Sequence, residues 1–477
     1  MQRLKKQILI GLLVLPYFSA VIAQTSLQNR IDRLLGNEFY QTASIGISVY
    51  DLTDNKPLYQ FNERKLCRPA SNMKLLTTAT ALQYLTSSYE FRTRLFYTGS
   101  IDSTGCLYGD LYLAGGFDPE FRSSDLDTMV YLMKKSGIQR FEGRIFADVS
   151  MADSVYWGKA WSWDDDMEAF QPYLSPLPVN KNVVKVRIIP ATPSRAPVIR
   201  TEPASAFISI ENNAVTAWKS SEPVKKTLNF HRTCDGFTNR IVISGNIPAS
   251  VPFYETMISL KNPNNYVLTL FSEKIAEQLP GSDLLYGGLS KTPLQAKTLG
   301  YTRHSISEVI RQLNKESDNL NAEMLLYALG LQCCNAPSST EKGIEMMQQM
   351  ITSLGFDPKK YSIVDGSGLS NQNYLTPELM VAILKYIYAS ENYPVFKSSL
   401  PEAGIDGTLA HRMKATAAYR KVFAKTGSLT GVNTISGYVH ANNGHILAFS
   451  IMIQNFTEKT SYVSVHYVDK LCEALVK

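Results

Sequence analysis

The chain has 477 residues, of which 44% are hydrophobic and 19% are charged. This balance is typical of a globular protein and excludes an intrinsically disordered chain. The length exceeds that of one ordinary compact domain, and a chain of this size can bury a large core without depending on disulfides.

The N-terminal segment has the pattern of a secretory signal peptide. Its basic residues are Arg3, Lys5 and Lys6, and the apolar run ILIGLLVLPYFSAVIA follows them. Small residues at Val21 and Ala23 predict a cleaved signal peptide over residues 1–23. Because the apolar run is short and is interrupted by Pro16, we expect no transmembrane anchor after cleavage. An uncleaved N-terminal anchor is the alternative.

The composition of the mature chain predicts neither a nucleic-acid partner nor a metal. Cleavage would remove three positive charges and no negative ones, so the formal net charge would fall from +6 to +3. Export would permit disulfides, but the sequence leaves open how the six cysteines pair: Cys67, Cys106, Cys234, Cys333, Cys334 and Cys472. Neither the cysteines nor the histidines have metal-ligand spacing, so we expect no metal and no cofactor.

The two ends of the mature chain predict one antiparallel sheet. The segment SIGISVYDLTDNKPLYQFN (44–62) alternates apolar and polar residues and contains the turn TDNK, which is typical of a β-hairpin. The C-terminal region predicts a strand at 421–427, a hairpin over 433–456 that turns at Asn443-Gly444, and an amphipathic helix at 468–477. We expect the two hairpins to join in one sheet, with the helix that begins near Ser71 packed against it.

The middle of the chain predicts a β-rich insertion. From about Tyr97 to Gly287, short strands are separated by turns rich in Gly, Pro, Asn and Asp. From about Leu294 to Tyr388 the pattern becomes helical again. We therefore expect three domains after the signal peptide. They are a main domain at 24–95 and 288–477, an inserted domain at 96–185 and 240–287, and a second β-rich domain nested in the insertion at 186–239.

Ser71 and Lys74 lie three residues apart at the start of an apolar stretch with helical spacing. Side chains with this separation share one face of a helix, and a Ser at the N-terminus gains from the positive end of the helix dipole. A Ser hydroxyl needs a base, and a Lys serves as one only when burial or a nearby cation keeps it neutral. The pattern is weak alone, because Ser339 and Lys342 match it too. A capped helix with a solvated Lys is the alternative.

Ser317, Asp318 and Asn319 precede a second helix with apolar periodicity. These residue types are common at helix N-termini, so an N-cap cluster is one interpretation. The functional interpretation is a second Ser that moves a proton, with an Asn that holds the substrate or Lys74.

Lys425, Thr426 and Gly427 end a predicted strand. Because it has no Cβ, Gly427 would let a substrate backbone approach closely. Thr426 and Ser428 would offer hydroxyls beside the Lys425 cation. The backbone amides of Ser71 and Ser428 would form an oxyanion hole. A strand followed by an ordinary turn is the alternative.

Together the three motifs are far more specific than any one of them. Ser-x-x-Lys, Ser-Asp-Asn and Lys-Thr-Gly occur in this order, each on a suitable element, and the set is typical of β-lactamases and penicillin-binding proteins. The chain resembles the D-alanyl-D-alanine carboxypeptidase/endopeptidase family, the low-molecular-mass class C penicillin-binding proteins. The segments that carry the resemblance are PASNMKLLTTATAL, SDNLNAEMLLYALG, AKTGSLTGVNTISGYV, VDGSGLSNQNYLTP and LPEAGIDGTLAHRM. The long separation of Ser71 from Ser317 fits this family, which inserts domains there.

The resemblance implies catalytic roles for five residues. Ser71 would form an acyl-enzyme with the penultimate D-Ala, and Lys74 would be its base. Ser317 would protonate the leaving amine and help deacylation. Asn319 and Lys425 would position the peptide and shape the field around Lys74.

The resemblance also implies substrate contacts. Thr426 and Ser428 would hold the terminal carboxylate with the neighbouring cation, and Gly427 lies between them. Asp148, in GRIFADVS, matches a position where the family places an Asp that faces the substrate side chain, and it would pair with a diaminopimelate amine. An Asp in a turn at a strand end is the alternative. Asn371 stands where family members often carry Arg, so a charged contact at the rim of the site would be missing, which affects fine specificity and not the reaction.

The expected fold is α+β, a penicillin-recognising serine transpeptidase/β-lactamase-like domain with an antiparallel sheet flanked by helices and a large β-rich insertion. The expected function is that of a periplasmic serine-type D-Ala-D-Ala carboxypeptidase, and the sequence leaves open whether the protein also acts as a D,D-endopeptidase. Its expected partners are peptidoglycan stem peptides as substrates and β-lactam antibiotics as covalent inhibitors. A serine β-lactamase and a wall-binding scaffold with a dead site are the alternatives.

Overall fold

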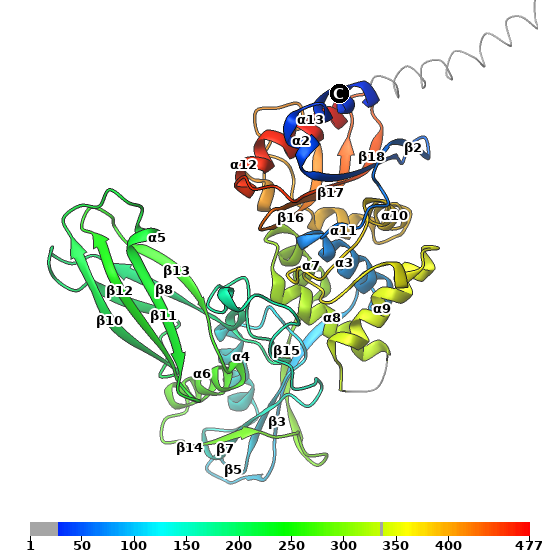
Figure 1. Ribbon diagram of the computed structural model, residues 1–477. Coiled ribbons are helices and arrows are strands. Elements are labelled where there is room, and N and C mark those ends of the chain that lie inside the picture. Colours follow the sequence, from blue (N-terminus) through cyan, green and yellow to red (C-terminus); the bar gives the residue numbers. More distant parts are fainter. Residues whose placement is uncertain (1–26, 334–336) are drawn as a thin grey trace, which may run out of the picture. The chain divides into compact units, whose positions relative to one another are not determined.

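A computed structural model describes residues 27–333 and 337–477 of the chain (Figure 1). The expected signal peptide at 1–23 lies outside these residues. The described residues form two compact units. The first unit contains 27–83, 310–317 and 347–477, and the second contains 84–309 and 318–346. The domain boundaries expected from the sequence stay predictions.

The first unit is built on a five-stranded sheet. Its strands lie in the order β16 (Val422–Leu429), β17 (Val432–His440), β18 (Ile446–Gln454), β1 (Ser44–Asp51) and β2 (Lys56–Phe61). Every neighbouring pair is antiparallel. β1 pairs with β18 from Ser44 opposite Gln454 to Asp51 opposite Leu447, so strands from the two ends of the chain lie side by side (Figure 1). The expected joining of the two hairpins is confirmed.

Helices cover this sheet. They include a helix at 27–35, α2 (Glu38–Thr42), η1 (Ala70–Asn72), α3 (Met73–Tyr84), α10 (Pro377–Tyr388), α11 (Tyr393–Ser399), α12 (Thr460–Val463), η6 (Ser464–Val468) and α13 (Asp469–Val476). Short 3-10 turns lie at η4 (Pro358–Lys360) and η5 (Gly407–Leu409). α10 begins where the Thr376 side chain accepts a hydrogen bond from Leu379 N at 3.2 Å, and it packs on β1, β17 and β18. One core joins the sheet to the helix at 27–35 and to α13.

The second unit contains three sheets. The largest runs in the order β15 (Lys297–Ser305), β3 (Glu90–Tyr97), β6 (Leu111–Ala114), β7 (Arg140–Asp148), β5 (Cys106–Tyr108) and β4 (Ser100–Ile101), and β14 (Asp283–Leu289) pairs with β7. A second sheet has the strand order β10 (Ile208–Ala217), β12 (Asn239–Pro248), β11 (Leu228–Cys234). The third has the order β13 (Tyr254–Ser259), β8 (Val183–Ile189), β9 (Val198–Glu202). The expectation of a β-rich middle therefore agrees with the strands found there.

The second unit also contains helices within the expected β-rich region. These are α4 (Ser123–Lys135), η2 (Trp163–Asp165), η3 (Asn180–Asn182), α5 (Val224–Thr227) and α6 (Pro263–Gln278). Conversely, β15 lies in the region expected to be helical. Its residues form a strand because they pair along β3, from Lys297 opposite Tyr97 to Ser305 opposite Glu90. That expectation was wrong for these residues. α7 (Ile306–Lys315), α8 (Asn319–Cys333) and α9 (Thr340–Ser353) follow. Over the described ranges, the helices are too short or too polar to cross a membrane.

Candidate active site

Ser71 lies in η1, the 3-10 turn that leads into α3, and Lys74 lies in the first turn of α3. The Lys74 Nζ donates a hydrogen bond to Ser71 Oγ at 3.1 Å and another to the Ser367 carbonyl oxygen at 2.7 Å. The lysine side chain is completely buried. A solvated lysine at the start of a helix, the alternative for this pair, is therefore not what the structure contains.

The segment 365–370 supplies that carbonyl oxygen. The buried Asp365 carboxylate accepts hydrogen bonds from Gly368 N at 2.8 Å and from Ser370 N at 2.7 Å, which folds the loop around it. Gly368 has a φ of +80°, and a Cβ there would lie 1.8 Å from the Ala70 carbonyl oxygen. The loop is thus pressed against η1, the turn that carries the expected nucleophile Ser71, which we call the nucleophile turn. Sequence reasoning matched this segment to the family without predicting a contact to Lys74.

Lys425 connects the second motif to the third. Its Nζ donates to Ser317 Oγ at 2.9 Å and to the Thr426 carbonyl oxygen at 2.7 Å. The side chain is completely buried. Burial first, and then the charge of Lys74, hold the pKa of Lys425 well below its usual range. Ser317 has a φ of +61°, a backbone conformation that non-glycine residues seldom adopt.

β16 presents the third motif on the edge of the sheet and continues to Leu429, beyond the expected end at Gly427. A Cβ on Gly427 would lie 2.9 Å from both the Pro69 carbonyl oxygen and Ser71 N. The glycine therefore lets the strand approach the nucleophile turn, which is a different reason from the substrate approach that the sequence suggested. Ser428 is exposed beyond it. The oxyanion hole formed by the Ser71 and Ser428 amides stays a prediction.

Thr426 and Asn72 complete the contacts around β16. Thr426 Oγ1 donates to Thr408 Oγ1 at 2.8 Å. The completely buried Asn72 side chain donates through its nitrogen to the Lys425 carbonyl oxygen at 2.8 Å, while its oxygen accepts from Ser436 N at 3.2 Å. Asn72 thereby fastens the nucleophile turn to β16 and β17. Sequence reasoning missed it, and its place between Ser71 and Lys74 was the only available signal.

The second Ser-x-x-Lys match has a different geometry. Ser339 Oγ accepts a hydrogen bond from the backbone N of Lys342 at 3.3 Å, which caps the start of α9. The Lys342 Nζ donates to the Pro337 carbonyl oxygen at 2.6 Å. This pair therefore forms the cap of a helix.

Two further predicted residues belong to the second unit. Asn319 opens α8, and its Nδ2 donates to the Phe170 carbonyl oxygen at 2.5 Å. Asp148 ends β7 and accepts hydrogen bonds from Ser150 N at 3.0 Å and Thr292 N at 2.7 Å. Burial acts to raise the pKa of Asp148, but the hydrogen bonds outweigh it and leave the pKa below its usual value. The substrate roles of both residues stay predictions.

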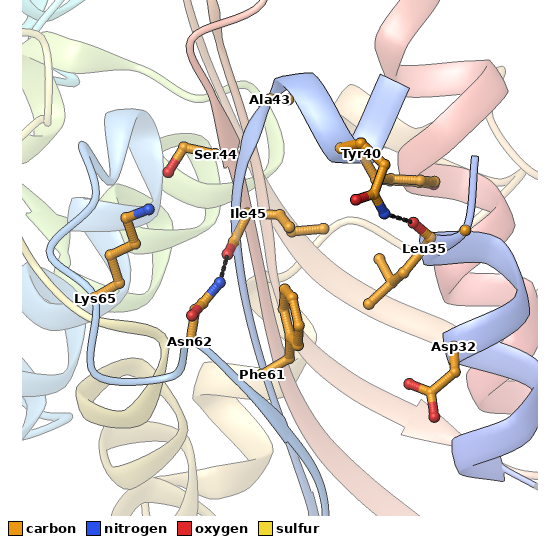
Figure 2. A pocket seen from close by; sticks show the side chains of 11 residues that line it. Asp32, Leu35, Tyr40, Ala43, Ser44, Ile45, Phe61, Asn62 and Lys65 are labelled. Carbon is orange, nitrogen blue, oxygen red and sulfur yellow. Dashed lines mark hydrogen bonds between the residues drawn. The ribbon is translucent and has the colours of Figure 1, made fainter. Parts of the chain in front are cut away.

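A cavity of about 500 Å³ in the first unit is separate from these residues. It lies beside the start of β1, and Figure 2 shows Asp32, Phe61 and Lys65 among the side chains around it. Asn62 donates there to the Ile45 carbonyl oxygen at 3.0 Å. None of the predicted site residues lines this cavity.

The five described cysteines are free thiols: Cys67, Cys106, Cys234, Cys333 and Cys472.

An antiparallel sheet flanked by helices, with a Ser–Lys pair where a 3-10 turn beside its edge strand leads into a helix, defines the penicillin-recognising serine peptidase class of fold. The crystal structure of penicillin binding protein 4 (dacB) from Haemophilus influenzae has the same fold, with a TM-score of 0.79 and 21% identity over 93% of this chain and 98% of that one. A second structure of that protein holds a β-lactam.

Residues 27–471 match the D-Ala-D-Ala carboxypeptidase 3 (S13) family, and the chain belongs to this family. It is 30% identical to the D-alanyl-D-alanine carboxypeptidase of Actinomadura sp. (strain R39), over 90% of this chain and 81% of that protein. It is 24% identical to D-alanyl-D-alanine carboxypeptidase DacB of Haemophilus influenzae, over 87% of this chain and 86% of that protein. The expected family and fold are confirmed, and the protein is a peptidase.

Proposed function

We propose that the protein is an exported serine-type carboxypeptidase that removes the terminal D-Ala from peptidoglycan stem peptides through an acyl-enzyme on Ser71. One observation carries the proposal. Two completely buried lysines each donate to a serine hydroxyl, Lys74 to Ser71 at 3.1 Å and Lys425 to Ser317 at 2.9 Å. The secretory pattern at residues 1–23 supports a periplasmic location.

Acylation begins when the Ser71 hydroxyl attacks the carbonyl carbon of the penultimate D-Ala. Lys74 in its neutral form takes the hydroxyl proton, which is within reach across 3.1 Å. The Ser317 hydroxyl gives a proton to the leaving amine of the terminal D-Ala and regains one from Lys425. Water then attacks the ester carbonyl and gives a proton through Ser317 to Lys425. The bond to Ser71 Oγ breaks, Lys74 returns its proton to that oxygen, and the shortened peptide leaves.

Lys74 and Lys425 have different protonation states in this mechanism because both are buried in the same site. Coulomb repulsion disfavours the state in which both are ammonium ions, and burial removes the water that would screen them. A substrate carboxylate that binds beside Lys425 favours the charge on that lysine. The proton then resides on Lys425, where it binds the substrate, and Lys74 is left free to act as the base.

The same nucleophile would attack D-Ala-diaminopimelate cross-links, because the scissile bond there also follows a D-Ala carbonyl. The lowered pKa of Asp148 favours its carboxylate form, which would attract the diaminopimelate amine. β-Lactams would acylate Ser71 as substrate mimics. A serine β-lactamase uses these motifs too and stays the alternative function.

The replacement Ser71→Ala tests the nucleophile. We expect loss of all labelling by fluorescent penicillin with an unchanged thermal unfolding curve, since only one oxygen atom is removed. Ser339→Ala is the matched control, because Ser339 has the same sequence motif but caps a helix. Labelling of the Ser71→Ala protein would place the nucleophile elsewhere and refute the proposal.

The lifetime of the penicillin adduct separates the two functions. An adduct that persists, together with loss of terminal D-Ala from a pentapeptide in mass spectra, supports the carboxypeptidase. Rapid release of hydrolysed penicillin would support the β-lactamase. Mass spectra of digested cross-linked muropeptides measure the endopeptidase activity in the same preparation.

A further inference from the structure

Three consecutive residues of η3, Asn180, Lys181 and Asn182, have left-handed backbones, with φ of 49°, 61° and 56°. Asparagine tolerates this conformation better than most residues do, whereas lysine has no such preference. Strain of this kind persists only where the surroundings impose it, and it is concentrated at functional sites. The strained lysine in the middle of this segment therefore needs an explanation.

The two asparagines hold the segment in place. The Asn180 side chain accepts from Ser123 N at 3.0 Å and donates to Ser123 Oγ at 2.7 Å. The Asn182 side chain accepts from Val179 N at 3.1 Å and donates to the Tyr173 carbonyl oxygen at 2.7 Å. Both amides are thus used to fix the backbone, and the side chain between them is aimed in one direction.

The Lys181 ammonium is directed at the start of α8. It donates to Glu120 Oε1 at 2.7 Å and to the Asn321 side-chain oxygen, and it lies 3.4 Å from Asp318 Oδ2. Glu120 and Asn321 are buried, with 3% and 0% of their surfaces exposed. A cation that is held between two carboxylates and a buried amide in this way has few alternative positions.

The same groups determine how α8 begins. Asp318 Oδ1 accepts from Asn321 N at 2.9 Å, and Asn321 Nδ2 donates to Glu120 Oε1 at 2.7 Å. Asn321 Nδ2 also donates to the Val309 carbonyl oxygen at 2.9 Å. Removing the ammonium would leave the carboxylates of Glu120 and Asp318 without the cation between them, and Asp318 would move away.

We propose that Lys181 is a positioning residue for the second motif. Asp318 is the next residue after Ser317, whose own backbone is left-handed with a φ of +61°. Fixing Asp318 therefore fixes the peptide that carries the Ser317 hydroxyl, which must stay at 2.9 Å from Lys425 Nζ to pass a proton. The proposal rests on the proposed function, in which Ser317 protonates the leaving group.

The replacement Lys181→Met tests this role, with Arg122→Met as the matched control. Arg122 lies 3.4 Å from the other oxygen of Glu120, so Arg122→Met also removes a cation from that carboxylate. Among the described residues, the Arg122 guanidinium forms no hydrogen bond or ion pair with α8. We expect Lys181→Met to lower the penicillin acylation rate and kcat by about ten- to a hundredfold, because small displacements of a catalytic group have large effects. KM should change by less than about twofold. Lys181→Arg should recover most of the rate, and Arg122→Met should resemble the wild type.

A folded Lys181→Met protein that acylates at the wild-type rate would overturn the proposal. A rise in KM with unchanged kcat would also overturn it, since that result belongs to a substrate-binding lysine. If Lys181→Met does not unfold cooperatively, Lys181→Gln replaces it. Failure of both variants to fold would identify a lysine needed only for folding and would reject the proposal. Persistent labelling of Ser71→Ala would instead refute the proposed function, so the two failures are distinguishable.

Discussion

The burial of Lys425 affects stability as well as chemistry. The pKa of Lys425 is lowered in the folded protein. At pH values between the lowered pKa and the usual pKa of about 10.4, the folded state therefore binds fewer protons than the unfolded state does. Stability should therefore rise with pH across that window. Below the lowered pKa, the folded protein carries the full cost of a buried ammonium ion.

The replacement Lys425→Met should relieve this cost while abolishing activity. We expect the variant to be more stable than the wild type at pH 7 by about 1–2 kcal/mol, since an apolar side chain of similar size needs no solvation. The difference should shrink as the pH approaches 10. Thermal unfolding between pH 6 and pH 10 measures it, with Lys421→Met, next to β16, as the control. A difference that grows with pH would contradict the assigned direction of the pKa shift.

At the scale of elements, the close approach of β16 to η1 depends on Gly427. A methyl group there would meet Thr434 Oγ1 at 2.3 Å as well as the nucleophile turn, so Gly427→Ala should separate the two elements. We expect a loss of about 1–3 kcal/mol of stability, which is typical of overpacking. The acylation rate should fall at least about tenfold because the nucleophile moves.

Gly46→Ala on β1 is the control for this change. Its Cβ would meet the Pro377 ring at 2.9 Å and the Asn62 carbonyl oxygen at 3.1 Å, in the same sheet but away from the Ser71 group. Denaturant unfolding and penicillin labelling should show that both variants lose stability and that only Gly427→Ala loses acylation rate. Equal acylation by the two would show that the glycine serves packing alone.

Local pattern predicted the hairpins, α3 and α8, because each has its own periodicity and turn chemistry. α4 had a readable signal as well, with Asp125 in its first turn and apolar residues at helical spacing that prove to be buried: Leu126, Met129, Val130 and Met133. β15 had none, since it is an edge strand whose structure depends on pairing with β3. Tertiary pairing, not local preference, determines such a strand.

The motif serines and lysines were predictable for the same reason that the family is recognisable, namely their order and spacing. The contacts that support them were not. The Ser367 carbonyl oxygen is a backbone group, which leaves no mark on residue identity, and Lys181 lies far in sequence from the helix that it contacts. The contact of the Ser367 carbonyl oxygen with Lys74 and the contact of Lys181 with α8 are created by folding, so only the structure reveals them.

At the scale of the molecule, each of the two units contains a hydrophobic core. The core around Leu95, Phe141 and Phe271 belongs to the second unit, and the core around Ile47, Ile435 and Leu475 belongs to the first. We therefore expect calorimetry to show two unfolding transitions. Acylation by penicillin at Ser71 should raise only the transition of the first unit, because the adduct stabilises the folded state that holds it.

Ser71→Ala should show no such shift, which makes it the control. A single transition, or an equal shift of both, would contradict this expectation. The unit whose transition moves can be identified by the loss of β1–β18 amide protection in hydrogen exchange at the same temperature.

The pairing of β1 with β18 has a consequence for how the protein matures. The second unit is encoded almost entirely between these strands, so its chain is complete while the partner of Ser44, Gln454, is still unmade. Closing a loop that spans nearly the whole polypeptide is slow, since the entropy of the chain must be given up before the strands can pair. We therefore expect the sheet beside Ser71 to be completed last, and a chain that ends before β18 to lack the proposed activity.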